Sequence, residues 1–218
     1  MLDEYLTLTK DLLRDDGRER VSDDQIGRAL SLAIAQYSKD RPWRSIEDAM
    51  VEAQSRFAYP SDASVSDVEY PIGGFPPTYL SRLQWGRYEA PDGVKLAFNS
   101  SMPEGATVRL VLLRAHELDE SSTTIPTADR EAVVSYAVAI LFDQIAAQTS
   151  GDGTPTIAAD AVNHAAKPEN YARRAERLRQ RYYDLIGLDP KRVVGASVTV
   201  SRPLPAADGG GRLTHRRR

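Results

Sequence analysis

The N-terminal part of the chain repeats apolar positions at the three- and four-residue spacing of amphipathic helices. Residues 3–14 predict a short helix whose buried candidates are Leu2, Tyr5, Leu6 and Leu13. A capping-box pattern, in which two side chains satisfy free backbone donors reciprocally, starts a second helix at Ser22 and Gln25. Its apolar positions are Ile26, Ala29, Leu30, Ala33, Ile34 and Tyr37, and Pro42 marks its end. A third helix is predicted from near Ser45, with Ile46, Ala49, Met50, Ala53 and Phe57 on one face.

The pattern changes after Tyr59-Pro60. Residues 60–120 contain six of the 13 prolines and show little helical periodicity. Several short runs instead alternate or are rich in β-branched and aromatic residues, which favours strands: "SVSDVEYPI", "SRLQWGRYEA", "VKLAF" and "TVRLVLLRAHEL". "APDG" at 90–93 and "MPEG" at 102–105 predict turns, since Asp-Gly accommodates the positive φ of a tight hairpin. A small antiparallel sheet inserted between helices is therefore expected.

Helical spacing returns at "TADREAVVSYAVAILFDQIAAQ". Thr127 is the expected N-cap, and Asp129 and Glu131 complement the helix dipole in the first turn. Residues 133–147 are apolar almost all round, so this helix must be covered on several sides, by its own domain and by another subunit. Its candidate packing residues are Ala137, Ile140, Leu141 and Ile145.

The last long helix carries many arginines. Pro168 suits its first turn, and one apolar stripe runs along it through Tyr171, Ala175, Leu178, Tyr182 and Leu185. Arg173, Arg174, Arg177 and Arg181 lie off that stripe, with Arg179 between them and Glu169, Glu176 and Asp184 nearby to pair with them. This pattern favours a packed helix with a salt-bridged outer face over direct contact with DNA or an interface with an acidic subunit.

These elements predict a mainly α fold, a helical bundle with an inserted small antiparallel β-domain and an extended C-terminal arm. The expected parts are N-terminal helices (1–62), a β-rich insert (63–120), C-terminal helices (121–187) and the arm (188–218).

Charge distinguishes the arm from the rest. From Lys191 onward there are seven lysines and arginines and one acid, Asp208, a formal charge of +6, whereas the remainder has 21 bases and 30 acids, or −9. Valines with strand character precede two prolines in this segment, so it is expected to become ordered on a partner. The residues expected to dock are Lys191, Arg192, Val193, Val194, Val198, Val200, Arg202, Arg216, Arg217 and Arg218.

Composition limits the other possibilities. The chain has no cysteine, which excludes disulfides, Cys-based metal sites and thiol nucleophiles. Its first residues are too acidic for a signal peptide, and no apolar stretch approaches the roughly 18 residues of a membrane helix. Synthesis and action in a reducing cytoplasm are expected, without a membrane partner.

Catalytic signatures are missing from the sequence. "HELDE" at 116–120 lacks the second histidine of a zinc-binding H-E-x-x-H pair, and His116, His164 and His215 lie in three separate segments. "IGGFPP" and "ADGGGR" lack the setting of a phosphate loop, and Asp152, Asp160 and Glu169 do not form a convincing carboxylate cluster. The sequence therefore argues against an enzyme and against a metal or other cofactor.

The order of the segments resembles the head–tail connector, or adaptor, proteins of tailed bacteriophages. Short helices ending "ALSLAIAQYSKDRP" precede a β-rich part with "VEYP", "PPTYL" and "VRLVLLRAHEL". The helix "DREAVVSYAVAILFDQIAAQ" and the segment "PTIAADAVNHAAKPENYARRAERLRQRYYDLIG" follow. The resemblance covers roughly residues 20–187. The β-rich insert departs from the shorter all-helical members.

The resemblance implies a structural virion protein of the neck, assembled in the host cytoplasm. It implies a ring of about a dozen copies between the capsid portal and the next neck or tail-terminator protein. DNA passes through the ring without sequence-specific binding, and the C-terminal arm reaches the portal. Two alternatives remain open: another neck component, such as a tail-completion or terminator protein, and a nucleic-acid-binding protein that uses the basic tail.

Overall fold

The computed structural model describes residues 1–18, 20–51, 56–58, 62–99, 102–103, 105–150 and 166–190, and for residues 15–18, 56–58 and 166–167 it describes the backbone alone. The chain divides into two compact units, Met1–Leu188 and Asp189–Arg218. The helices and strands described here all belong to the first unit.

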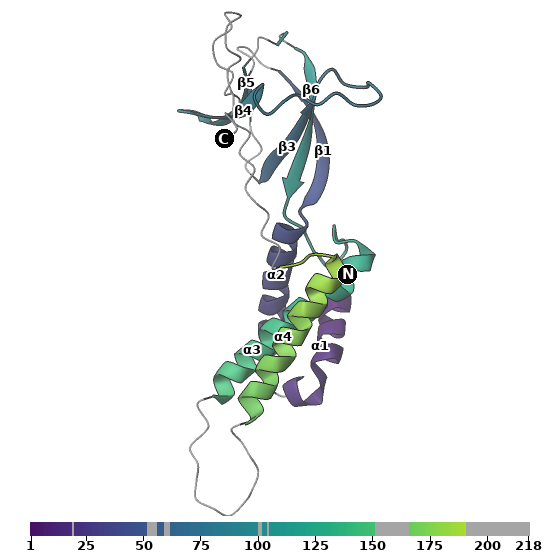
Figure 1. The fold of residues 1–218 in the computed structure, drawn as a ribbon, viewed down its shortest axis with the longest axis vertical. Coiled ribbons are helices and arrows are strands. Elements are labelled where there is room, and N and C mark those ends of the chain that lie inside the picture. The colour runs from purple at the N-terminus through teal and green to yellow at the C-terminus, as the bar shows by residue number, and fades with distance from the viewer. Residues whose placement is uncertain are drawn as a thin grey trace, which may run out of the picture. The chain divides into compact units, whose positions relative to one another are not determined.

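The helical part is built around one long helix. Its elements are α1 (Leu2–Arg18), α2 (Asp23–Asp40), the 3₁₀ turn η2 (Thr127–Asp129), α3 (Arg130–Thr149) and α4 (Ala166–Ile186). α3 packs along α4 and also contacts α1 and α2 (Figure 1). From Val133 to Ile145 no α3 residue is exposed. The hydrophobic cluster around it includes Tyr5, Ile26, Leu30, Val138, Leu141 and Tyr182.

The predicted N-terminal cap of α2 was confirmed, and that of α3 was wrong. The capping box of α2 forms as predicted: Ser22 accepts a hydrogen bond from the Gln25 backbone, and the Gln25 side chain accepts one from the Ser22 backbone. Thr127, in contrast, is not the N-cap of α3. It begins η2, and Asp129 is the N-cap, without a side-chain capping bond. The Asp129 carboxylate instead accepts hydrogen bonds from Tyr37 and Arg41.

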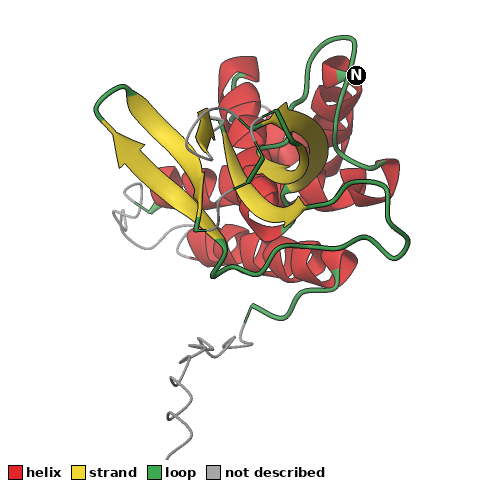
Figure 2. Ribbon diagram, turned by 90° about the horizontal axis from the view of Figure 1, so that it is seen from above, coloured by secondary structure: helices red, strands yellow, loops and turns green. Residues whose placement is uncertain are grey.

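The strands form two three-stranded antiparallel sheets (Figure 2). The first has the order β1–β6–β3, and the second the order β2–β5–β4. Their bounds are β1 Trp43–Met50, β2 Arg56–Ala58, β3 Ala63–Glu69, β4 Trp85–Ala90, β5 Gly93–Phe98 and β6 Thr107–Arg114. A second hydrophobic cluster belongs to this part of the chain: Val51, Val65, Val68, Trp85, Leu96, Met102, Val108, Leu110 and Leu112.

The predicted turn at 90–93 is present, and the described residues on either side of Glu104, which itself lies outside the described residues, have the hydrogen bond and the glycine φ of a turn. Ala90 pairs with Gly93 at the end of the β4–β5 hairpin, and Gly93 has a φ of 130° that a side chain would strain. In the second turn the Ala106 amide donates to the Pro103 carbonyl at 3.1 Å, and Gly105 has a φ of 77°.

The third helix, predicted from Ser45, is wrong. Residues 43–50 form β1, which pairs with β6 along its whole length. Ile46 and Met50, placed on a buried helix face, are 63% and 66% exposed. Apolar residues four positions apart share a helix face but also share one face of a strand, so the local pattern does not decide between them. The long-range pairing with β6 decides it.

The prediction of a mainly α chain is therefore also wrong. Among the described residues, helix accounts for 47% and strand for 25%, in two antiparallel sheets, so the fold is a mixture of α and β. The sheet content was underestimated because β1 and β2 lie in the segment assigned to a helix, and because the strands form two sheets where one was expected.

Candidate assembly surfaces

The predicted packing residues of α3 and α4 lie in the core of the chain itself. Ala137, Leu141, Ile145 and Tyr182 are buried, and Ile140, Tyr171 and Leu178 are partly buried against the same cluster. Near the end of α4, Ile186 is buried and Leu185 is 41% exposed, so the predicted stripe is wrong at that position. Because α1, α2 and α4 cover α3, its apolar circumference by itself does not require a neighbouring subunit.

α3 also corrects an expectation about membrane-length helices. By length and composition, Thr127–Thr149 is apolar enough to cross a membrane. In the protein, 56% of its most apolar 18-residue stretch is buried. The core helix of a folded domain can have the same length and composition. The packing against three other helices accounts for its composition.

Four of the five arginines of α4, all but Arg177, are seen in ion pairs or ring contacts. Arg173 pairs with Glu169 at 3.2 Å on the same helix. Arg179 and Arg181 pair with Asp143 and Glu131, both on α3. The guanidinium of Arg174 lies 5.9 Å from the centre of the Phe142 ring. The salt-bridged outer face is thus observed, but acids of α3 supply partners that the sequence pattern had placed on α4 itself.

A partly buried polar cluster joins the ends of α2 and α4 to the start of α3. Tyr37 donates to Asp129 at 2.6 Å, and Arg41 donates to Asp129 at 2.8 Å and to the Ile186 carbonyl at 2.7 Å. Burial raises the pKa of Tyr37, and the hydrogen bond to Asp129 raises it further. The phenol therefore stays neutral and acts as a donor, which fits a structural role.

His116 is part of the same junction. Its ring nitrogens lie 3.0 Å from the Thr124 hydroxyl and 2.8 Å from the Arg41 carbonyl, and its ring lies 4.8 Å from that of Tyr37. Its backbone amide donates to Ser38. Both nitrogens thus have protein partners, so His116 holds the chain where it returns from β6 to the helices.

Within the described ranges, no group of three His, Asp or Glu side chains is placed to hold a metal ion. Glu169 is in an ion pair with Arg173. His164, His215, Asp152 and Asp160 lie outside the described residues. So do the expected docking-arm residues from Lys191 to Arg218.

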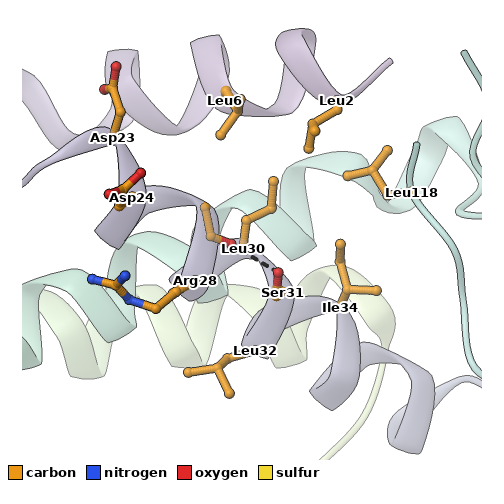
Figure 3. A pocket seen from close by; sticks show the side chains of 11 residues that line it. Leu2, Leu6, Asp23, Asp24, Arg28, Leu30, Ser31, Leu32, Ile34 and Leu118 are labelled. Carbon is orange, nitrogen blue, oxygen red and sulfur yellow. Dashed lines mark hydrogen bonds between the residues drawn. The ribbon is translucent and has the colours of Figure 1, made fainter. Parts of the chain in front are cut away.

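An apolar groove lies between α1 and α2, with a volume of about 730 Å³. Leu2 and Leu6 on α1 point toward Leu30 on α2, and Leu118 and Ile34 border one end (Figure 3). We call this the α1–α2 groove; its other lining residues are Asp23, Asp24, Gly27, Arg28, Ser31 and Leu32. A Cβ on Gly27 would meet no atom within 4 Å, so the glycine leaves open space along the groove. Gly27, an isolated glycine in a helical pattern, is the signal that sequence reasoning missed.

The second surface that sequence reasoning missed is an apolar loop between β3 and β4, residues 70–84, which we call the Phe75 loop. Phe75 is 100% exposed, Leu83 68% and Tyr79 47%. Phe75 was noted in the sequence only as part of a glycine-containing stretch. Its aromatic side chain beside prolines was the available signal, since large exposed apolar groups mark interaction sites.

Comparison with known proteins gives no assignment: no protein-family model matches the chain, and no curated protein matches it.

Proposed function

We propose that this chain is a structural neck protein of a tailed bacteriophage, a head–tail connector that forms a ring between the capsid portal and the tail. The observation that carries the proposal is the exposure of large apolar side chains on α2, on β1 and on the Phe75 loop. Leu32, Ile46, Met50, Phe75 and Leu83 are all more than half exposed. A chain with such surfaces is suited to assembly, because burial of apolar area drives association.

The net negative charge of the chain before Lys191 supports the passage of DNA through the ring without tight binding. The chain before Lys191 has a formal charge of −9. The arginine-rich helix α4, which would be the natural phosphate-binding element, directs Arg173, Arg179 and Arg181 to carboxylates. Binding to DNA depends on cations that neutralise phosphates, so a net acidic ring favours sliding.

Electron microscopy and native mass spectrometry of the purified chain test the proposal, alone and mixed with the portal protein of the same virus. We expect closed rings of about a dozen copies that sit on the portal. A chain that neither forms rings nor joins the portal contradicts the proposal. Rings that join only a tail tube indicate a terminator, and binding to DNA that disappears with salt indicates the nucleic-acid-binding alternative.

A further inference from the structure

The Phe75 loop is held in shape by its own hydrogen bonds. At its base the Tyr70 amide donates to the Thr78 carbonyl at 3.0 Å, and the Leu80 amide donates to the Val68 carbonyl at 2.8 Å. Closer to the tip, the Gly73 amide donates to the Glu69 carboxylate at 3.2 Å. A loop fixed in this way loses little conformational entropy when it binds, so the exposed Phe75 is a preorganised apolar anchor.

The α1–α2 groove has complementary properties. Its volume of about 730 Å³ is in the range of pockets that bind small organic ligands, and an aromatic side chain is no larger than such a ligand. Leucines and Ile34 line it, and Asp24 at one end is exposed. Asp23 beside it is already paired with Lys10 at 2.7 Å.

The charges of the Phe75 loop and of the α1–α2 groove are also complementary. Residues 70–84 include one cation, Arg82, and no acid. Arg82 lies over the Trp85 ring and donates to the Ser66 carbonyl, and within the described part of the chain it forms no ion pair with a carboxylate. An exposed cation on the loop and an exposed carboxylate at the groove are suited to fix the orientation of the loop.

We infer that the Phe75 loop of one copy of this chain inserts into the α1–α2 groove of the next copy. The inference rests on the proposed ring and names the contact that forms it. A loop on one surface that fills a groove on another makes a head-to-tail contact, and such a contact closes into a ring when the rotation between neighbouring copies closes, or otherwise builds an open filament. A two-fold dimer, by contrast, would place the same surface on both sides.

Two variants test each half of the contact with little risk to the fold. Phe75→Asp removes the anchor at a fully exposed position. Gly27→Leu fills the groove where a side chain has open space, and it replaces glycine by a better helix former. We expect each variant alone to be folded and monomeric by native mass spectrometry, whereas Leu185→Asp, a control on α4 at a position that is 41% exposed, forms the same rings as the unchanged chain.

An equal mixture of the two variants gives the sharper result. Phe75→Asp keeps an intact groove and Gly27→Leu keeps an intact loop, so the mixture forms one contact and stops at a heterodimer. A mixture that stays monomeric overturns the inference. Rings formed by either variant alone also overturn it and leave the proposed function standing; if the Phe75→Asp ring then fails to join the portal, the loop belongs to that contact instead.

Crosslinking tests the contact even if free rings do not form. The chain has no cysteine, so a pair introduced as Gly74→Cys and Ser31→Cys is free of background. Oxidation at high protein concentration should give a ladder of disulfide-linked copies, and the pair Gly74→Cys with Ile46→Cys should not. A monomer with an internal disulfide, or no crosslink, overturns the inference. A ladder from a chain that never joins the portal supports the contact while contradicting the proposed function.

Discussion

The phenol of Tyr182, near the end of α4, donates a hydrogen bond of 2.6 Å to the carboxylate of Asp40, the last residue of α2. The two residues are 142 positions apart in the sequence. The bond joins the last helix to the point where the chain leaves the helices for β1. Together with the Tyr37–Asp129 hydrogen bond, it connects α2, α3 and α4 at the point where the chain leaves α2.

These two tyrosines predict how stability depends on pH. Burial, together with the hydrogen bond to a carboxylate, raises the pKa of both Tyr37 and Tyr182. The neutral phenol is thus favoured in the folded chain, and this stabilisation is complete below pH ~10, the ordinary tyrosine pKa, and is lost as pH rises above it. Chemical denaturation from about two pH units below that pKa to about one unit above it measures the loss.

Tyr182→Phe is expected to cost about 2 kcal/mol at neutral pH, because it removes a hydrogen bond to a charged group. Its stability should then fall less steeply than that of the unchanged chain above pH ~10. Tyr79→Phe, at a position 47% exposed, is the matched control and should change neither quantity. Equal alkaline slopes for all three proteins would contradict the stated role of Tyr182.

Leu141 tests the core around α3. It is fully buried, so Leu141→Asp places an unpaired carboxylate among apolar side chains and should cost several kcal/mol, enough to prevent soluble folding. Ile46→Asp makes the same change on the exposed face of β1, 63% exposed, and should remain soluble. A soluble Leu141→Asp protein with a cooperative melting transition would show that the packing of α3 is wrong.

The sequence predicted the elements whose signals are local. The Ser22–Gln25 capping box and the Asp92-Gly93 turn were found because they need neighbouring residues alone. β1 was missed because Ile46 and Met50 fit a helix face as well as a strand face, and the pairing of β1 with β6 connects residues far apart in the chain. A pairing of that kind leaves no mark in a short window of sequence.

Gly27 and Gly93 form a matched pair for testing backbone freedom. Gly27 has open space and lies inside α2, so Gly27→Ala should stabilise the chain by about 0.5–1 kcal/mol. Gly93 has a φ of 130°, a conformation that alanine adopts with strain, so Gly93→Ala should lower stability. Thermal melting of both variants measures the difference in sign. A loss of stability for Gly27→Ala would show that the groove is not open there.

A deletion that removes all the strands between α2 and α3, and leaves no strand without its partner, should leave the helices folded. Trp43 and Arg114 are directly paired, so the block begins and ends at adjacent positions. Replacing residues 43–114 with a short Gly/Ser linker should leave a soluble helical protein, measured by circular dichroism. Starting the deletion at Ala63 would instead leave β1 without β6, and extending it to Asp119 would remove the His116 contacts to Ser38 and Arg41. Loss of helical signal for the 43–114 deletion would contradict the independence of the helical core.

The functional surfaces were harder to predict than the fold. The arginines of α4 drew attention because they cluster in sequence, yet three of them are paired with carboxylates. The α1–α2 groove was not predicted because it lies between two helices, and Leu2, Leu6 and Leu30, which line it, all fit the pattern of buried helix positions. A cluster of charges can be recognised from the order of residues in the sequence, whereas a groove depends on how helices pack in the folded protein.

The C-terminal segment gives the last prediction, on sequence grounds, since residues 191–218 lie outside those described. It carries a charge of +6, together with Val193, Val194, Val198 and Val200. Docking on the portal should need both the charges and the valines, because buried apolar area gives affinity that salt does not screen. Binding to DNA needs the arginines alone and weakens steeply with salt.

Truncation after Asp189 should therefore leave the body folded and stop it from joining the portal. Val198→Asp combined with Val200→Asp should do the same while leaving the terminal Arg216, Arg217 and Arg218 in place. Co-sedimentation with portal rings at low and high salt measures both effects, and circular dichroism checks the fold. If the valine changes leave assembly intact and removal of the three terminal arginines blocks it, the segment is an electrostatic tether, and the idea of an apolar docking arm is wrong.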